Sequence, residues 1–314
     1  MSRAIIFPGQ GSQSVGMGRG LASQYPEARE VFEAVDDALG EKLSAVIWNG
    51  PNEELTLTEN AQPALMAVSL ATFRVLENQG FNLTNHADYV AGHSLGEYSA
   101  LAASGALTLA DTAKLLRIRG KAMQQAVPVG VGAMAALLGP DFDTVVEIAA
   151  KASADEEICS AANDNAPGQV VISGSAAAVA RAIDLAKEAG AKRAVELPVS
   201  APFHCSLMSP AADAMRDALA DVEISAPQIP IVTNVTAASC SDPEEIRSRL
   251  VEQVTGSVRW RESVEWLFQN NVTELVEVGS GKVLTGLARR INRELVASAI
   301  NEAEDVDAFI ASLT

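Results

Sequence analysis

The chain has 314 residues, of which 48% are hydrophobic and 4% aromatic, and its formal net charge is −17. This length suits a large core divided into two domains, or one domain with an insertion. The acidic balance argues against nucleic acid as a partner, and no window contains about 18 uncharged apolar residues, which argues against a membrane span.

The first third of the chain alternates between strand and helix patterns. Apolar runs at residues 4–7 and 89–91 predict strands. Helices are predicted at residues 27–39, 63–79 and 109–125. Such alternation is typical of a parallel sheet covered by helices.

Residues 129–199 follow a different pattern. This segment predicts, in chain order, a strand, a helix, two strands, a helix and a strand, at residues 132–138, 141–152, 157–162, 169–173, 176–189 and 193–198. That is the order of a ferredoxin-like unit, and the glycine and proline residues at its ends suit an inserted subdomain. Beyond it we predict strands at residues 229–234 and 274–278, and helices at residues 282–295 and 305–313.

Cysteine and histidine are too sparse for a metal site. Cys159, Cys205 and Cys240 have no metal-ligand spacing, which indicates free thiols in a reducing cytoplasm. The three histidines form no zinc motif, so we expect neither a metal nor another cofactor. The first apolar run is too short for the core of a signal peptide, which agrees with a cytoplasmic protein.

One short motif points to covalent chemistry. Gly92-His93-Ser94-Leu95-Gly96 follows the strand predicted at residues 89–91 and opens a helix-prone stretch at residues 97–103. This is the setting of a nucleophile elbow, in which a serine on a sharp strand-to-helix turn projects its hydroxyl off the sheet. The alternative is a glycine-rich turn that a serine merely caps. Ser94 is therefore the candidate nucleophile.

The elbow completes the predicted fold class. We expect an α/β protein whose large α/β-hydrolase-like subdomain, residues 1–128 and 200–314, contains the parallel sheet and the elbow. The ferredoxin-like unit at residues 129–199 is the small inserted subdomain.

A serine nucleophile needs a base to take its proton. Three histidines are available. His86 lies in a polar loop and reads as a surface residue, while the side chain of His93 should leave the turn in a different direction from Ser94. His204 lies on a proline-flanked stretch at the domain junction, which suits a general base.

Arg119 stands out within the helix predicted at residues 109–125. On a helical wheel it falls inside the apolar arc that Leu115 and Ile118 help to form, whereas Arg117 falls on the opposite, polar side. A guanidinium on a core-facing stripe needs an anionic partner. That partner is either an internal Asp or Glu, or a carboxylate that arrives with the substrate and is bound by the guanidinium fork.

Acyl transfer also requires amide donors for the developing oxyanion. The N–H of Leu95, directly after the nucleophile, is one candidate. The loop at residues 8–13, after the first strand, supplies a second. A nucleotide site in this loop is the weaker interpretation, because the Gly-x-Gly-x-x-Gly pattern is not completed and no lysine accompanies it.

These motifs together resemble one family, the malonyl-CoA:acyl carrier protein transacylases of type II fatty acid synthesis, which are related to the acyltransferase domains of polyketide synthases. The resemblance covers nearly the full length. It rests on separate segments in the same order: Phe7-Pro8-Gly9-Gln10-Gly11-Ser12, Gly92-His93-Ser94-Leu95-Gly96-Glu97, Arg119-Gly120-Lys121-Ala122-Met123-Gln124, Asn165-Ala166-Pro167-Gly168-Gln169, Pro202-Phe203-His204-Cys205 and Glu277-Val278-Gly279-Ser280-Gly281-Lys282-Val283-Leu284.

The resemblance implies a role for each central residue. Ser94 would carry the malonyl ester, and His204 would act as general base and then acid. Arg119 would bind the malonyl carboxylate. The oxyanion amides would come from Gln10 and Leu95.

Gln253 matches the position whose backbone carbonyl orients the histidine, so the family uses a dyad without an acidic third member. Because that role concerns the backbone, substitution of the Gln253 side chain is expected to be mild. Phe203 resembles the bulky residue associated with malonyl over methylmalonyl selection, and Met123 and Asn165 fall among the substrate-binding positions.

Two further features enter through the resemblance. The basic residues at four positions match proposed docking sites for an acidic carrier protein: Lys192, Arg193, Arg289 and Arg290. Gly279-Ser280-Gly281 departs from the commoner Gly-Pro-Gly, for which we expect a small backbone effect.

The predicted reaction is therefore ping-pong transfer of malonyl from malonyl-CoA to acyl carrier protein, with CoA and the carrier as partners. A hydrolase using the same elbow would need an acid such as Asp141, Asp143 or Asp155 as third member and water as acceptor. A carrier-binding scaffold without chemistry is the third interpretation, which the joint presence of serine, histidine and arginine opposes.

Overall fold

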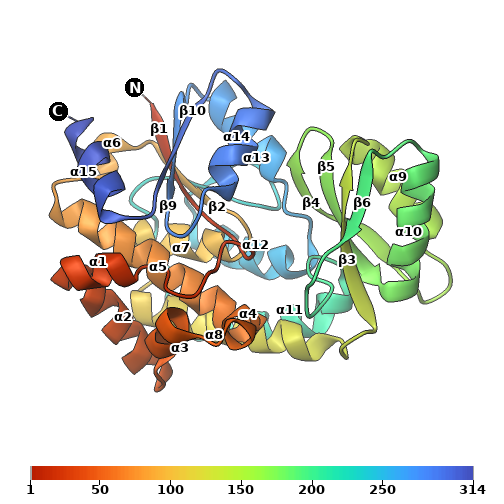
Figure 1. Ribbon diagram of the computed structural model, residues 1–314, viewed down its shortest axis with the longest axis horizontal. Helices are drawn as coiled ribbons and strands as arrows, with labels where there is room; N and C mark the ends of the chain where they lie inside the picture. The colour runs from red at the N-terminus through yellow and green to blue at the C-terminus, as the bar shows by residue number, and fades with distance from the viewer. Residues whose placement is uncertain (1, 314) are drawn as a thin grey trace.

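A mainly parallel sheet, sheet A, forms the centre of the larger part of the molecule (Figure 1). The computed structural model describes residues 2–313. Sheet A has the strand order β10-β9-β1-β2-β7-β8. Its strands are β1 (Arg3–Phe7), β2 (Tyr89–Gly92), β7 (Ile231–Val232), β8 (Ser239–Cys240), β9 (Glu274–Val278) and β10 (Val296–Ile300). All neighbours pair in parallel except β7 and β8, which are antiparallel.

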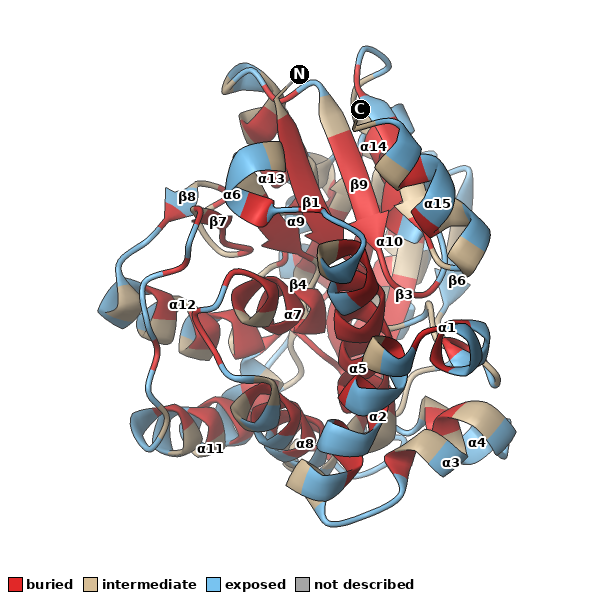
Figure 2. Cartoon of the chain, turned by 90° about the vertical axis from the view of Figure 1, so that its left-hand side faces the viewer, coloured by how far each residue is buried: buried red, intermediate tan, exposed pale blue. Residues whose placement is uncertain are grey.

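Both faces of sheet A are covered, as its unbroken apolar strands require. Along β1, Ile5 and Phe7 belong to one core cluster, whereas the alternate residues Ala4 and Ile6 belong to another. The first cluster includes apolar residues of helix α5 (Thr58–Asn78), and the second includes residues of helices α13 (Trp260–Gln269) and α14 (Val283–Ile291). Figure 2 shows strands β1 and β9 and much of α5 buried.

The helices surround these sheets. In the first 126 residues they are α1 (Arg19–Gln24), α2 (Pro26–Leu39), α3 (Leu43–Asn49), α4 (Asn52–Thr56), α5 (Thr58–Asn78), α6 (Leu83–His86), α7 (Leu95–Ala103) and α8 (Leu109–Ala126). In the rest of the chain they are α9 (Phe142–Ala152), α10 (Ala176–Glu188), the 3₁₀ turn η1 (Ser206–Met208), α11 (Ser209–Ala220), α12 (Pro243–Thr255), α13 (Trp260–Gln269), α14 (Val283–Ile291) and α15 (Ala303–Ala311). Between residues 2 and 313, none of the helices combines the length and apolar character needed to traverse a bilayer.

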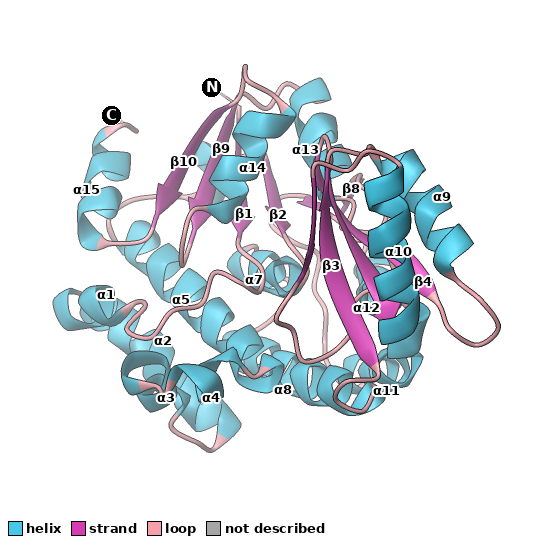
Figure 3. Cartoon of the chain, turned by 45° about the vertical axis from the view of Figure 1, so that its right-hand side comes forward, coloured by secondary structure: helices cyan, strands magenta, loops and turns pink. Residues whose placement is uncertain are grey.

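Sheet B is antiparallel, with the order β4-β5-β3-β6. Its strands are β3 (Gly132–Leu138), β4 (Cys159–Ala166), β5 (Gln169–Ser175) and β6 (Arg193–Glu196). Helices α9 and α10 cover one face, as Figure 3 shows, and share a separate core cluster with it. The strand order and the β-α-β-β-α-β sequence confirm the ferredoxin-like prediction. The subdomain limits at residues 129 and 199 stay a prediction.

Strand β4 ties sheet B to the rest of the molecule. Asn163 forms a parallel bridge with Val258, and Asp164 N–H donates to the Val258 carbonyl at 2.9 Å. The buried Asp164 carboxylate also pairs with Arg261 of α13 at 2.8 Å. On its other face, sheet B contributes Met134 to the main core cluster, so the two sheets enclose a shared interior.

The structure corrects several predicted boundaries. The helix predicted at residues 282–295 ends at Ile291, and the following Val296–Ile300 is the unpredicted edge strand β10. Strand β4 extends through Ala166, so the turn before β5 contains only two residues rather than the six predicted. Strand β7 has two residues, although residues 229–234 were expected to form it. The helix predicted from residue 63 begins at Thr58, upstream of its internal proline.

Candidate active site

Ser94 occupies a sharp turn between β2 and α7. Its backbone φ of 52° and ψ of −111° is a strained conformation for a residue with a side chain. Close packing explains the flanking glycines. A Cβ on Gly92 would lie 1.9 Å from the Gly96 carbonyl oxygen, and a Cβ on Gly96 would lie 2.3 Å from that of Phe7. This geometry is that of a nucleophile elbow.

Asn234, two residues after the end of β7, holds this turn in place. Its Oδ1 accepts a hydrogen bond from the Ser94 N–H at 2.7 Å, and its Nδ2 donates to the Gly92 carbonyl at 2.7 Å. Sequence analysis assigns Asn234 no role, because nothing local links residue 234 to residue 94. The side chain stabilises the strained backbone from the neighbouring strand.

His204 lies in hydrogen-bond contact with the nucleophile. Its Nε2 is 2.8 Å from Ser94 Oγ, and its Nδ1 is 2.9 Å from the Gln253 carbonyl oxygen. A carbonyl only accepts, so Nδ1 carries the proton and Nε2 is free to accept from the serine hydroxyl. Burial, and then the charge of Arg119, lower the pKa of His204 to about 3, which keeps the imidazole neutral at ordinary pH.

The acidic residues that a hydrolase triad would need lie elsewhere. Asp141 caps the N-terminus of α9 by accepting from Thr144 N–H. Asp141 and Asp143 line a second, smaller cavity beside sheet B, and Asp155 lies in the turn before β4. The Nδ1 partner of His204 is a backbone carbonyl, so the pair is a dyad.

Arg119, on α8, points its guanidinium at the same hydroxyl. Its Nη2 lies 3.1 Å from Ser94 Oγ and 2.8 Å from Gln253 Oε1, and its Nη1 donates to Gln62 Oε1 at 2.6 Å. The side chain is 1% exposed. Between residues 2 and 313 it forms no ion pair, and its Nε has no hydrogen-bond partner. Among these residues, no internal Asp or Glu is therefore in direct contact with the guanidinium, which is held by the neutral side chains of Ser94, Gln62 and Gln253.

The helical wheel placed Arg119 correctly but misplaced two of its neighbours. Ile118, expected on the apolar arc, is 39% exposed. Arg117, expected on the polar side, is buried and pairs with Glu41 while donating to the Glu59 carbonyl. Helix α5, which packs beside α8, supplies Glu59, and the segment between α2 and α3 supplies Glu41. A helical wheel cannot represent such neighbours.

The two expected oxyanion donors lie at the adjacent carboxyl ends of β1 and β2, whose last residues, Phe7 and Gly92, pair in register. In the described part of the chain, the N–H groups of Gln10 and Leu95 make no hydrogen bond. The Gln10 loop is fixed by other contacts: Gln10 Oε1 accepts from Thr58 at 2.9 Å, and Ser280 Oγ donates to the Ser12 carbonyl at 2.7 Å. The serine of Gly279-Ser280-Gly281 thus supports this loop.

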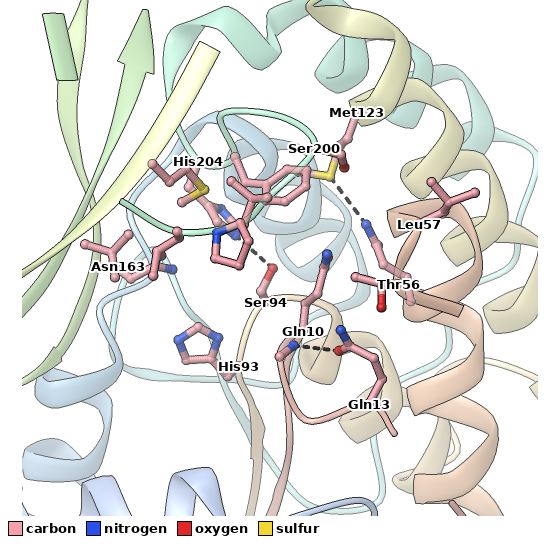
Figure 4. A pocket seen from close by; sticks show the side chains of 18 of the residues that line it. Gln10, Gln13, Thr56, Leu57, His93, Ser94, Met123, Asn163, Ser200 and His204 are labelled. Carbon is pink, nitrogen blue, oxygen red and sulfur yellow. Dashed lines mark hydrogen bonds between the residues drawn. The ribbon is translucent and has the colours of Figure 1, made fainter. Parts of the chain in front are cut away.

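These groups open into one cavity of about 700 Å³ between the two sheets (Figure 4). Its lining includes Met123, Phe203 and Asn165, as well as Met134 and Val171 of sheet B.

His93 also lines this cavity, but it bonds away from the nucleophile. Its Nε2 lies 2.9 Å from Asn165 Oδ1. This contact agrees with the expectation that its side chain leaves the turn in its own direction. His86 lies outside the cavity, at the end of α6, where its Nδ1 accepts from Asn82 N–H.

Three of the four basic residues predicted for docking, Lys192, Arg193 and Arg290, lie near one end of sheet B. Arg193 opens β6 and Gln169 opens β5, and both pair with Leu138 of β3. Arg290 donates to Gln169 Oε1 at 2.7 Å, which brings α14 to the same end. The neighbouring Lys192 and Arg289 are exposed as well. Arg289 Nη2 donates to the Ala297 carbonyl of β10 at 3.0 Å, so Arg290 is the residue of its pair that contacts sheet B.

The Gln253 side chain makes contacts in the site that sequence analysis does not predict. It is fully buried, and its amide contacts three groups of the site: it accepts from Arg119 and donates to the Ser94 carbonyl at 2.9 Å and to Glu97 at 2.8 Å. These contacts argue against the expectation that its substitution is mild.

Sequence analysis also missed Gln62 and Glu97, although Glu97 carries one signal: it is the charged residue in the otherwise uncharged segment of α7.

The site residues do not suit a metal. Among residues 2–313, no three His, Cys, Asp or Glu side chains are grouped so as to hold a metal ion. The polar groups gathered around Ser94 in the cavity are instead its hydroxyl, the His204 imidazole, the Arg119 guanidinium and amides, and Glu53 is the single carboxylate among the described residues that line the cavity. The groups around Ser94 are those that nucleophilic transfer of an anionic acyl group requires.

Known proteins are similar to this chain over nearly its full length. Residues 4–306 match the family described as acyl transferase domain. The malonyl CoA-acyl carrier protein transacylase of Escherichia coli strain K12 is 48% identical over 299 residues, covering 95% of this chain and 96% of that protein. The crystal structure of the acyl-carrier-protein-S-malonyltransferase from Bartonella henselae has a TM-score of 0.97 at 58% identity, covering 100% of this chain and 99% of that one. A malonyl-transacylase in complex with a type II PKS acyl-carrier protein has a TM-score of 0.96 at 43% identity, covering 99% of this chain and 100% of that one.

Proposed function

Because the chain belongs to the acyl transferase domain family, we propose that it transfers malonyl from malonyl-CoA to the phosphopantetheine thiol of acyl carrier protein. The reaction supplies chain-extension units for fatty acid biosynthesis. The observation that carries the proposal is the 3.1 Å contact between Arg119 Nη2 and Ser94 Oγ. A serine–histidine pair serves many acyl groups, whereas a buried cation beside it selects an acyl group that bears a second carboxylate.

In the first half-reaction, Ser94 Oγ attacks the thioester carbonyl carbon while His204 Nε2 takes the hydroxyl proton. The N–H groups of Leu95 and Gln10 donate to the oxyanion of the tetrahedral intermediate. Its collapse breaks the carbon–sulfur bond, and His204 returns the proton to the leaving CoA thiolate. The product is a malonyl ester on Ser94.

The second half-reaction runs the same steps in reverse. The carrier thiol gives its proton to His204 and attacks the ester carbonyl, and Ser94 Oγ leaves and regains that proton. One thioester is consumed and one is formed, so no oxidant, reductant or net water is needed.

The malonyl carboxylate is bound by Arg119 throughout. Gln62 and Gln253 hold the two terminal nitrogens of the guanidinium, so the fork is preorganised. Binding of the carboxylate also offsets the charge that depresses the pKa of His204.

The test is intact-mass measurement after mixing with malonyl-CoA. The unmodified protein should accumulate one malonyl adduct, and Ser94→Ala should accumulate none. Carrier protein bearing its phosphopantetheine should then discharge the adduct. Steady release of free malonate without a carrier would instead indicate a hydrolase, and a protein that forms no adduct would be a scaffold.

Carrier docking belongs to the basic surface of Lys192, Arg193, Arg289 and Arg290, which offers the acidic carrier a complementary charge. Reversing charge with Lys192→Glu and Arg193→Glu should raise the KM for carrier protein by roughly tenfold and leave the KM for malonyl-CoA nearly unchanged, since electrostatic complementarity governs the encounter.

The matched control is the double variant Lys42→Glu with Arg74→Glu. Both residues are exposed cations; Lys42 lies between α2 and α3, and Arg74 lies on α5. This pair changes the net charge equally but should leave both KM values unaltered. Equal responses from the two double variants would show that total charge, rather than this surface, determines carrier binding.

We assign the reaction to the cytoplasm. Cys159, Cys205 and Cys240 are free and buried, which suits a reducing compartment, as do thiol substrates.

A further inference from the structure

Glu97 is a buried carboxylate that the proposed reaction does not use. It lies on α7, three residues after the nucleophile, and is 1% exposed. Between residues 2 and 313 it forms no ion pair within salt-bridge distance. Burying a carboxyl group without a paired charge is costly, so its presence beside the site calls for a structural explanation.

Glu97 and the Ser94 carbonyl together fix the direction of the Gln253 amide, because both accept from its Nε2. Glu97 Oε2 accepts from Gln253 Nε2 at 2.8 Å. An amide side chain has one donating and one accepting end, so its Oε1 must face the opposite way, where it accepts from Arg119 Nη2 at 2.8 Å. A reversed amide would set its NH₂ group against the guanidinium, donor against donor.

The same carboxylate oxygen supports the nucleophile from a second side. Glu97 Oε2 accepts from the backbone N–H of Asn234 at 3.1 Å. The Asn234 side chain in turn bonds to the backbone of Ser94 and Gly92. The Asn234 N–H and Gln253 Nε2 both donate to Oε2 of Glu97, so this oxygen must be an acceptor. A proton on the other carboxyl oxygen, Oε1, leaves both hydrogen bonds intact.

We propose that Glu97 is a positioning residue: by accepting from Gln253 it orients that amide, and through it aims Arg119 at the carboxylate of the acyl group. The inference rests on the proposed function and deepens it by adding a residue that determines malonyl selectivity. Glu97 itself touches neither the acyl group nor the reacting atoms.

The decisive measurement is the ratio of kcat/KM for malonyl-CoA to that for acetyl-CoA, because only the malonyl group uses Arg119. Glu97→Met removes the acceptor at similar length, and should lower the ratio about 10- to 100-fold, as expected when a binding group is displaced by about 1 Å. Glu97→Gln keeps an oxygen at Oε2, and should hold the ratio within about threefold of the unmodified protein.

Glu277 provides the matched control. It is also fully buried, and it accepts from the N–H groups of Leu284 and Thr285 at the start of α14, outside the cavity. Glu277→Met should destabilise the protein, because it too leaves buried donors unpaired. It should not change the malonyl-to-acetyl ratio, which separates lost stability from lost selectivity.

Each outcome decides the matter. An unchanged ratio in Glu97→Met, or equal losses in Glu97→Gln and Glu97→Met, would overturn the acceptor role. If Glu97→Met does not fold, Glu97→Asp takes its place: the shorter carboxylate cannot reach both donors, and an unaltered ratio would again refute the inference. Failure of the unmodified protein to form a malonyl adduct would instead refute the proposed function.

Discussion

Replacing Arg119 with alanine should lower kcat/KM for malonyl-CoA by roughly 100-fold or more and leave acetyl transfer unchanged or faster. The malonyl carboxylate would lose its charged partner in a buried site, which costs far more than the loss of an exposed contact. Acetyl has no such group, and with Arg119 present its methyl faces a desolvated, unpaired guanidinium. Removing the cation also removes one cause of the depressed pKa of His204.

The measurement is the rate of acyl-adduct formation with malonyl-CoA and with acetyl-CoA, monitored by intact-mass spectrometry. Arg119→Lys is the informative companion, because it keeps the charge but loses the planar fork. It should fall between the unmodified protein and the alanine variant for malonyl. Equal losses for malonyl and acetyl in Arg119→Ala would show that the arginine only supports the fold.

Replacing His204 with alanine should slow Ser94 acylation by about 10³-fold or more, because the hydroxyl would lose its general base. The pH profile of the unmodified protein supplies a second, sharper expectation. A base acts when deprotonated, so its acid limb falls at its pKa. Since the pKa of His204 is lowered to about 3, kcat/KM should show no loss attributable to this residue between pH 8 and pH 5.

The profile is measured by single-turnover adduct formation across that range. A limb with its midpoint near 6.5, the ordinary histidine value, would contradict the buried, cation-facing environment of His204. A limb that persists in His204→Ala would belong to another group.

The catalytic core of the site could be predicted because its signals are local. Ser94 lies in a five-residue motif whose glycines are required by contacts within the same turn. His204 emerged by elimination among three histidines. Arg119 emerged because a charge on an apolar helix face is visible in one helical stretch.

The side-chain contacts of the supporting residues could not be predicted in this way; Gln253 was expected only through the family resemblance, and only for its backbone carbonyl. Asn234 reaches Ser94 across 140 residues, and Gln253 reaches Glu97 across 156. Neither side chain differs in its local sequence from an ordinary surface amide. Only the parallel pairing of β2 with β7, and the packing of α12 behind the elbow, bring them together.

The fold shows the same division between local and distant information. The longer helices and most strands of the first 200 residues are readable from periodicity, whereas the short helices α1, α3, α4 and α6, and later α11, α12 and α13, were not assigned. Strand β10 has small residues at its centre and owes its conformation to pairing with β9, so its own sequence did not separate it from the preceding helix.

The bridge between Asn163 and Val258 has a consequence for chain-length tolerance. Ser94 and Arg119 form one wall of the cavity, while Met134 and Val171 of sheet B form the wall opposite. The spacing between these walls therefore depends on how β4 is joined to the larger subdomain, through this bridge and the Asp164–Arg261 ion pair, and not on the lining side chains alone. Substitutions at this fastening would widen or narrow the room for an acyl chain without altering any atom that meets it.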